Sequence, residues 1–188
     1  MNFEHEKKQF LSKRDRSPIG EIDKDILPLC NLINSKKDYY TNSSCSGRIL
    51  LMKELGKKIE NAFLFTTHNK TSFKEVKRAL SKIKVTDPVY FKHEPCIMHI
   101  TCRDIKDAFK IVNIARNVGW KRSGVFTKRN CVELISTEVI RTPVMDKGKI
   151  LVEDSYLDLL VKQANIKLTQ TRKKISNLTE ELKVLSNK

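Results

Sequence analysis

The chain has 188 residues, enough for one domain with a substantial core, and 37 lysines and arginines against 22 acidic residues give it a net charge of +15. This excess of cations favours a polyanionic partner, nucleic acid before an anionic membrane surface. No apolar run is long enough to span a membrane, the first residues are charged, and the five cysteines follow no paired spacing. We therefore expect a cytoplasmic protein with reduced thiols.

The first third of the chain predicts two helices followed by strands. Residues 4–16 are charged, as in a short helix or in an arm that contacts phosphate. Apolar residues recur at helical spacing over 22–34, and Pro28 within this pattern predicts a kink or an end. Strands are expected at 39–44, at 48–55, where the apolar run indicates burial on both faces, and at 62–67.

The middle of the chain predicts a capped helix and two strands. Ser72 and Glu75 form a capping-box pattern that starts a helix over 73–83. A short strand is expected at 89–91, and alternation predicts another at 96–102.

The strand at 96–102 separates His99 from its core residues. One face carries the residues expected in the core, Cys96, Met98, Ile100 and Cys102. His93, Cys96, His99 and Cys102 are spaced like zinc ligands, but alternation sends His99 and the cysteines to opposite faces, and no Cys-x-x-Cys pair exists. We therefore expect no metal site.

The remainder predicts a helix, four short strands and a long terminal helix. Asp104 caps the first helix and Gly119 ends it. Its apolar positions are Ile105, Ala108, Phe109, Val112 and Ala115. Strands follow at 121–127 and 131–137, and a hairpin at 144–152.

The long helix begins at Ser155 and carries a heptad seam. Its apolar positions alternate steps of three and four: Val161, Ala164, Leu168, Thr171, Ile175, Leu178, Leu182 and Leu185. The helix either lies along its own domain or pairs with a second chain, so the protein is a monomer or a dimer through this helix. We expect one α+β domain over 1–154, with 155–188 as its helical extension.

The order of elements indicates the fold class. Strand–strand–helix–strand patterns around Phe73 and Phe109 hint at an internal duplication within a single mixed or antiparallel sheet with packed helices. No Gly-x-Gly-x-x-Gly motif follows a strand, which disfavours a Rossmann-type fold.

Two stretches are dense in groups that suit polar ligands. In 39–48, hydroxyls, a glycine and the donor fork of Arg48 suit close approach by a ligand, although a serine-rich turn explains the same residues. In 115–124, Trp120 among cations suits single-stranded RNA, unless the ring packs in the core. His99 follows Glu94-Pro95 and is a candidate for chemistry or a structural hydrogen-bonding residue.

Several motifs in order resemble the tRNA wybutosine-synthesising protein 3 family. They are Asp15-x-Ser17-x-x-Gly20-x-x-Asp23, Tyr39-Tyr40-Thr41-x-Ser43-Ser44-Cys45-Ser46-Gly47-Arg48, Glu94-Pro95-x-x-x-His99, Ala115-Arg116-x-x-Gly119 with Ser123-Gly124, and Glu133-x-x-Ser136-Thr137. The resemblance implies methyl transfer from S-adenosylmethionine to a ring nitrogen of the demethylated wyosine base beside the anticodon of phenylalanine tRNA. It also implies that the methyl donor does not sit on a standard nucleotide-binding sheet.

The resemblance suggests roles for particular residues. Cofactor binding falls to Ser43, Ser44, Ser46, Gly47, Arg48, Gly119, Ser123 and Gly124. Proton transfer or orientation of the base falls to His99, with Glu94 or Glu133 as its partner. RNA contact falls to Ser17, Tyr39, Tyr40, Arg116 and Trp120. Two other readings remain open, a non-catalytic basic RNA-binding module and a coiled-coil assembly protein.

Overall fold

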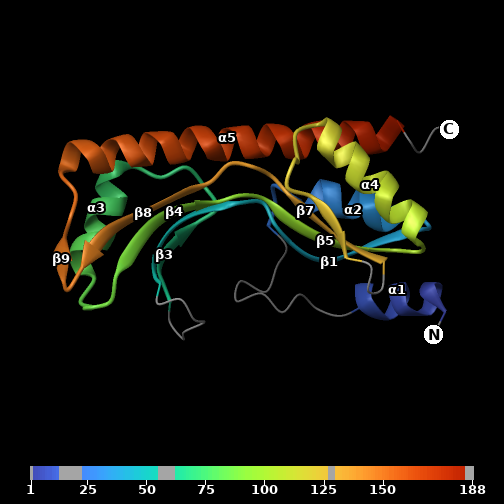
Figure 1. Cartoon of the computed structure of the whole chain (residues 1–188), viewed down its shortest axis with the longest axis horizontal. Coiled ribbons are helices and arrows are strands. Elements are labelled where there is room, and N and C mark those ends of the chain that lie inside the picture. The colour runs from blue at the N-terminus through green and yellow to red at the C-terminus, as the bar shows by residue number, and fades with distance from the viewer. Residues whose placement is uncertain (1, 13–22, 55–61, 127–129, 185–188) are drawn as a thin grey trace. The chain divides into compact units, whose positions relative to one another are not determined.

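A computed structural model describes residues 2–12, 23–54, 62–126 and 130–184. The chain divides into two compact units (Figure 1). The first unit comprises residues 1–46, 96–137 and 171–188, and the second comprises 47–95 and 138–170. No helix in the described ranges is long and apolar enough to cross a membrane.

The first unit is built on a four-stranded antiparallel sheet. In spatial order its strands are β1 (Tyr39–Cys45), β5 (Ile97–Cys102), β7 (Cys131–Ile135) and β6 (Gly124–Phe126). Its helices are α1 (Phe3–Leu11), α2 (Leu27–Ser35), α4 (Ile105–Asn117) and the last turns of α5 (Asp154–Val184).

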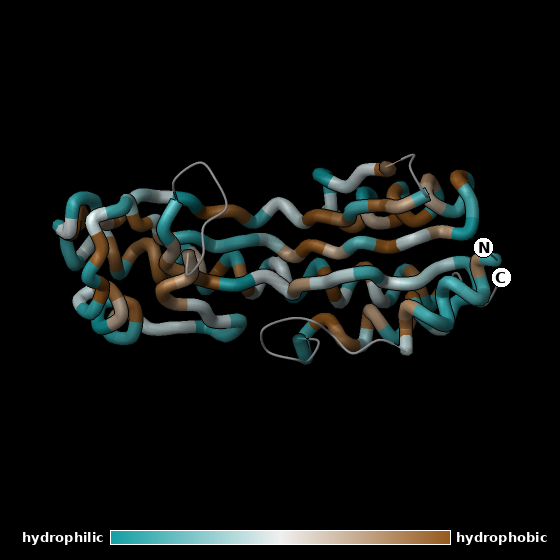
Figure 2. The backbone as a smooth tube through the Cα atoms, turned by 90° about the horizontal axis from the view of Figure 1, so that it is seen from below, coloured by the Kyte–Doolittle hydropathy of each residue, from teal (hydrophilic) through white to brown (hydrophobic). Residues whose placement is uncertain are grey.

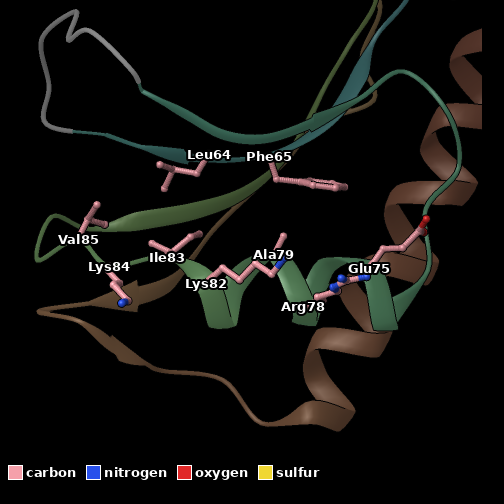
Figure 3. A pocket seen from close by; sticks show the side chains of 9 residues that line it. All are labelled: Leu64, Phe65, Glu75, Arg78, Ala79, Lys82, Ile83, Lys84 and Val85. Carbon is pink, nitrogen blue, oxygen red and sulfur yellow. The ribbon is translucent and has the colours of Figure 1, made fainter.

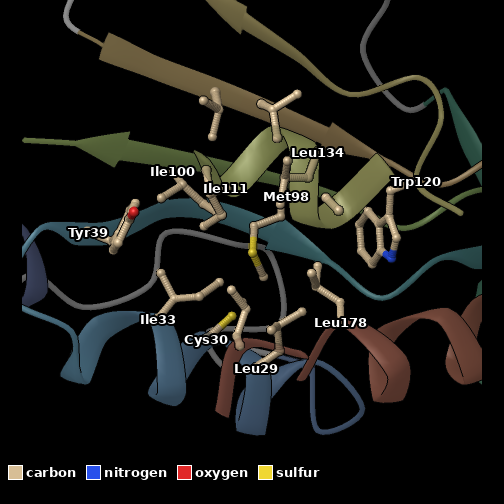
Figure 4. Close-up of a cluster of buried hydrophobic side chains, with 14 of the residues drawn as sticks. Leu29, Cys30, Ile33, Tyr39, Met98, Ile100, Ile111, Trp120, Leu134 and Leu178 are labelled. Carbon is tan, nitrogen blue, oxygen red and sulfur yellow. The ribbon is translucent and has the colours of Figure 1, made fainter. Parts of the chain in front are cut away.

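One face of this sheet carries the core of the first unit. Met98 and Ile100 of β5 are fully buried together with Leu29 of α2, Ile111 of α4 and Leu178 of α5 (Figure 4). Alternation along the strands puts hydrophobic and hydrophilic residues on opposite faces, so short segments of each kind succeed one another along the chain (Figure 2). The predicted core face of β5 is confirmed.

Helix α1 covers a corner of the opposite, more polar face. The rings of Phe3 and Phe10 each lie 5.5 Å from the ring of Tyr40, centroid to centroid. Tyr40 is therefore buried although its strand position faces away from the main core.

The second unit contains a five-stranded antiparallel sheet. In spatial order its strands are β3 (Phe63–Thr67), β2 (Arg48–Lys53), β4 (Val89–Glu94), β8 (Ile140–Asp146) and β9 (Lys149–Ile150). Its core joins strand residues such as Leu51 and Phe91 to Leu80 of α3 (Phe73–Lys82) and Leu168 of α5.

Most predicted elements are confirmed, including the capping box of α3 and the hairpin of β8 and β9. The strands divide between two sheets, however, and not one. The patterns around Phe73 and Phe109 fall one in each unit, and their common origin stays a prediction.

Two helices differ in detail from what their sequence patterns suggest. Pro28 does not kink α2, because it lies in the first turn, where its missing N–H costs no hydrogen bond. Phe109 is 54% exposed, since the buried face of α4 runs through Ala108, Ile111, Val112 and Ala115.

The heptad seam of α5 packs against the strands and helices of its own chain. Val161, Ala164 and Leu168 are buried in the second unit, and Ile175, Leu178 and Leu182 in the first. These side chains are not available to a partner helix. Of the two alternatives for this helix, the structure supports packing along its own chain.

Candidate active site

A row of polar residues crosses the open face of the sheet in the first unit. Ser43 of β1 lies opposite His99 of β5, which lies opposite Glu133 of β7. Gly124 of β6 completes the row beside Glu133. Antiparallel register therefore brings together four residues that are up to 90 positions apart in the sequence.

Hydrogen bonds connect three of these side chains. Oγ of Ser43 lies 2.9 Å from Nδ1 of His99, and Nε2 of His99 lies 3.0 Å from Oε2 of Glu133. A carboxylate only accepts hydrogen bonds, so Nε2 carries a proton, and in the neutral imidazole Nδ1 accepts from the Ser43 hydroxyl. The His99 side chain is 32% exposed, so a substrate can reach it.

A β-bulge beside Ser43 extends the polar face. The pairing of β1 with β5 shifts register between Thr41 and Ser43, and Nδ2 of Asn42 donates to Oγ1 of Thr101 at 3.0 Å. The same amide lies 3.7 Å from Sγ of Cys131. Bulges commonly re-aim side chains next to active sites. Asn42, Thr101 and Cys131 were not predicted as site residues, although the strand alternation already put Thr101 on the face of His99.

The serine-rich stretch contributes one exposed hydroxyl, that of Ser43. Ser44 faces the core side, where its Oγ accepts from Sγ of Cys30 at 3.4 Å. Ser46 is fully buried and donates to the carboxylate of Asp23. The hydroxyls of Ser44 and Ser46 therefore make contacts inside the fold at the end of β1, which leaves Ser43 as the exposed hydroxyl that can contact a ligand.

Arg48 and Glu94 form an ion pair within the second unit. Nε of Arg48 lies 2.7 Å from Oε2 of Glu94, and the guanidinium carbon lies 4.6 Å from the ring centroid of Phe63. Of the two partners expected for His99, Glu133 makes the hydrogen bond and Glu94 is engaged by Arg48.

In the stretch 115–124 the ring of Trp120 is buried, so it does not form the expected stacking platform. Trp120 has no exposed surface, and its Nε1 donates to the carbonyl of Lys174 at 3.2 Å. The Ser123 hydroxyl donates to the carbonyl of Trp120 and accepts from the N–H of Ile135, and Arg116 donates to the carbonyl of Ser123. Large aromatic rings gain more from core burial than from exposure, so Trp120 and Ser123 serve the core and not a ligand.

The two tyrosines that open β1 are also covered. Tyr39 donates to Oδ1 of Asp107 at 3.4 Å, and burial raises the pKa of its phenol. Tyr40 lies beneath α1 and is 2% exposed. Neither ring offers a free face for stacking on a base, while Ser17 lies outside the described residues.

The histidine and cysteine cluster does not converge on one point. Cys96 and Cys102 are buried on the core face of β5, and burial together with Asp107 raises the pKa of the Cys102 thiol. His99 lies on the opposite face. Within the described ranges, no group of three or more histidine, cysteine or acidic residues is arranged to hold a metal ion.

A second histidine, His93 of β4, is buried in the second unit. Its Nδ1 lies 2.8 Å from the carbonyl oxygen of Glu138, while its Nε2 has no hydrogen-bond partner among the described residues. Burial lowers the pKa of this imidazole. His93 is therefore a neutral structural residue, which alternation in β4 could have indicated.

Comparison with known proteins identifies the family. The family model described as Methyltransferase TYW3 matches residues 5–184. The chain belongs to the TYW3 methyltransferase family. The resemblance drawn from the sequence motifs is thereby confirmed.

Relatives and solved structures cover nearly the whole chain. A tRNA(Phe) 7-((3-amino-3-carboxypropyl)-4-demethylwyosine(37)-N(4))-methyltransferase of Thermococcus sibiricus is 35% identical over 190 residues, 98% of this chain and 96% of its own length. The Archaeoglobus fulgidus protein of the same name is 40% identical over 169 residues, 88% of this chain and 85% of its own. The PH1069 protein of Pyrococcus horikoshii has the same fold, with a TM-score of 0.87 at 34% identity over 98% of this chain and 95% of that chain.

Proposed function

We propose that this protein is an S-adenosylmethionine-dependent tRNA methyltransferase that methylates N4 of the demethylated tricyclic base beside the anticodon of phenylalanine tRNA. Relatives with this activity in their names match nearly the full chain, which supports the substrate. The hydrogen-bonded row of Ser43, His99 and Glu133 on an open sheet face carries the catalytic part of the proposal. The net charge of +15 suits an RNA substrate.

Methylation of a ring nitrogen that bears hydrogen requires a proton acceptor. As the carbon–nitrogen bond forms, the carbon–sulfur bond of the methyl donor would break, the donor would leave as a neutral thioether, and the N–H proton must leave the ring. Nδ1 of His99 would receive that proton, directly or through the Ser43 hydroxyl. The imidazole becomes positively charged in this step. The carboxylate of Glu133 stabilises that charge and holds the ring in one orientation.

The open face also suits a polar methyl donor. A side-chain carbon added at Gly124 would meet no atom of the residues that the structure describes within 4 Å, so there is room beside Glu133. Of the residues predicted to bind the cofactor, we retain Ser43 and Gly124 because one exposes a hydroxyl and the other borders open space. S-adenosylmethionine supplies an electrophilic methyl group when bound. The protein contributes positioning and proton transfer.

Transfer of labelled methyl groups from S-adenosylmethionine to tRNA tests the proposal. Label is expected on phenylalanine tRNA that carries the demethylated tricyclic base and not on the unmodified transcript. His99→Ala is expected to lower kcat by at least about 100-fold while tRNA binding persists. Phe109→Ala, a change of an exposed ring on α4, serves as the matched control and leaves kcat unchanged.

Failure to label either RNA would contradict the proposal, provided that the protein is folded and binds tRNA. That outcome would favour the non-catalytic RNA-binding module. Unchanged turnover of His99→Ala would instead keep the methyltransferase and remove His99 as the proton acceptor.

A further inference from the structure

The second unit contains a groove between β3 and α3, called here the β3–α3 groove (Figure 3). Its volume is about 540 Å³. Leu64 and Phe65 line it from the strand, and Arg78 and Lys82 line it from the helix. Ile83 and Lys84 continue the wall after the helix ends. All of these residues belong to the second unit, so the groove is formed by that unit alone.

The rim of the groove carries uncompensated positive charge. Arg78, Lys82 and Lys84 make no ion pair with any residue in the part of the chain that the structure describes. Lys77, one helical position from Arg78, shows the contrast, because it pairs with Asp154. Three cations at one groove attract an anionic ligand.

The acidic residue of the groove is already used inside the fold. Oε2 of Glu75 accepts from the N–H of Ser72 at 2.7 Å, from the Ser72 hydroxyl at 2.9 Å and from the Thr71 hydroxyl at 3.0 Å. These bonds belong to the capping box at the start of α3. Glu75 therefore faces its own helix terminus and does not pair with the cations of the rim.

The floor of the groove is apolar and partly aromatic. Phe65 and Leu64 pack only partly into the core of the second unit, and Phe65 lies at the strand side of the groove, facing α3 (Figure 3). Strand β3 is an edge strand, paired among the described strands with β2 alone. An apolar aromatic floor with a cationic rim matches unpaired nucleotides, whose bases stack while their phosphates meet lysine and arginine.

The size of the groove selects among nucleic-acid forms. A volume of about 540 Å³ lies in the range of pockets for small molecules, so bases that are splayed out of a helix can enter, whereas a duplex cannot. We propose that the β3–α3 groove binds an unpaired stretch of the RNA substrate through its bases and phosphates. The inference rests on the proposed function for the identity of that RNA, and it adds a second RNA site in the unit that lacks His99.

A triple variant tests the charged rim. Arg78→Ala, Lys82→Ala and Lys84→Ala together are expected to raise the tRNA dissociation constant about 10- to 100-fold at low salt. The slope of log K against log salt concentration is expected to become less negative by about two to three. The matched control changes three exposed cations elsewhere, Lys106→Ala, Lys162→Ala and Lys183→Ala. An equal loss of tRNA affinity in both triple variants would show that the effect comes from the change in net charge alone, which would overturn the proposal.

A second variant tests the apolar floor. Phe65→Leu keeps an apolar side chain but removes the ring, so it is expected to weaken tRNA binding about 5- to 10-fold with an unchanged salt slope. A single-stranded oligonucleotide is expected to compete for the groove better than a duplex of equal charge. Better competition by the duplex would contradict binding of unpaired nucleotides. Thermal unfolding of each variant confirms that the fold is retained.

The binding assay separates this inference from the proposed function. tRNA binding is measured without turnover, so an absence of methyl transfer leaves the test of the groove intact. If the protein transfers methyl groups as proposed, the groove variants should show a higher KM for tRNA and an unchanged kcat at saturating tRNA. Unchanged tRNA binding by the rim variant, with loss of a self-association seen in the native protein, would assign the groove to a second copy of the chain and overturn the proposal.

Discussion

Nε2 of His99 lies 3.0 Å from Oε2 of Glu133, and the register of β5 and β7 sets the two residues directly opposite each other. The contact is made by neighbouring strands of one sheet, so it does not depend on a flexible loop. A carboxylate held in this way fixes the tautomer of the imidazole and leaves Nδ1 as the basic atom.

Replacing Glu133 by glutamine should therefore impair proton transfer without removing the side chain. We expect Glu133→Gln to lower kcat about 10- to 100-fold, because a neutral amide stabilises the imidazolium less and permits the other tautomer. Single-turnover methylation measures the effect. Glu180→Gln, an exposed change on α5, is the control. An unchanged rate for Glu133→Gln would exclude a catalytic role for this carboxylate.

Gly119 is a position where the backbone requires glycine. Its φ is +98°, and an added side-chain carbon would lie 3.1 Å from Cε of Lys174. We expect Gly119→Ala to reduce the free energy of unfolding by about 1–2 kcal/mol. Gly124→Ala is the matched control, since its added carbon meets no described residue within 4 Å and the stability should change by less than about 0.5 kcal/mol. Denaturant unfolding of the two variants compares them, and equal losses would refute the explanation.

The capping box of α3 offers a test of local helix stability. The Ser72 hydroxyl accepts from the N–H of Glu75, while that N–H loses its side-chain acceptor in Ser72→Ala. We expect this variant to lose about 1 kcal/mol of stability. Ser81→Ala, at an exposed position in the last turns of the same helix, should change the stability by less than about 0.5 kcal/mol. A larger loss at Ser81 would show that the cap is not the stabilising feature.

Stability should depend on pH through His93. Burial lowers the pKa of the folded imidazole below that of the unfolded chain, so the unfolded state binds more protons as the pH falls. The contribution of neutral His93 to the free energy of unfolding is fully present above the unfolded pKa of about 6.5, and it is lost as the pH falls below that value. We expect the free energy of unfolding to fall between pH 7 and pH 5, and to fall less in His93→Gln. Equal pH dependence in both proteins would show that His93 does not titrate differently on unfolding.

The apolar seam of α5 should act within one chain. Leu178 is fully buried, and we expect Leu178→Ala to cost about 2–5 kcal/mol of stability at every protein concentration. Leu159→Ala is the control, because Leu159 is 49% exposed on the same helix. A melting temperature that rises with protein concentration in the native chain and not in Leu178→Ala would instead indicate a dimer through this seam.

Much of the local structure follows from short-range signals in the sequence. The capping box at Ser72, the glycine at position 119 and the alternation along 96–102 each depend on residues a few positions apart, and the elements formed as predicted. The family resemblance was likewise carried by contiguous motifs, so it needed no tertiary information.

Which of the predicted site residues meet depends on contacts between segments that are far apart in the sequence. Ser43, His99 and Glu133 met because sheet register joined three distant strands, and the sequence left Glu94 and Glu133 as equal alternatives. Three other predicted site residues are buried, namely Trp120, Tyr40 and Ser123. Burial depends on what packs over a residue, which is Phe3 for Tyr40 and the last turns of α5 for Trp120. Local pattern by itself determined the helices, most strands and the family. Only tertiary packing decided which polar residues face a ligand, because hydrophobic burial and strand register act between segments that are remote in sequence.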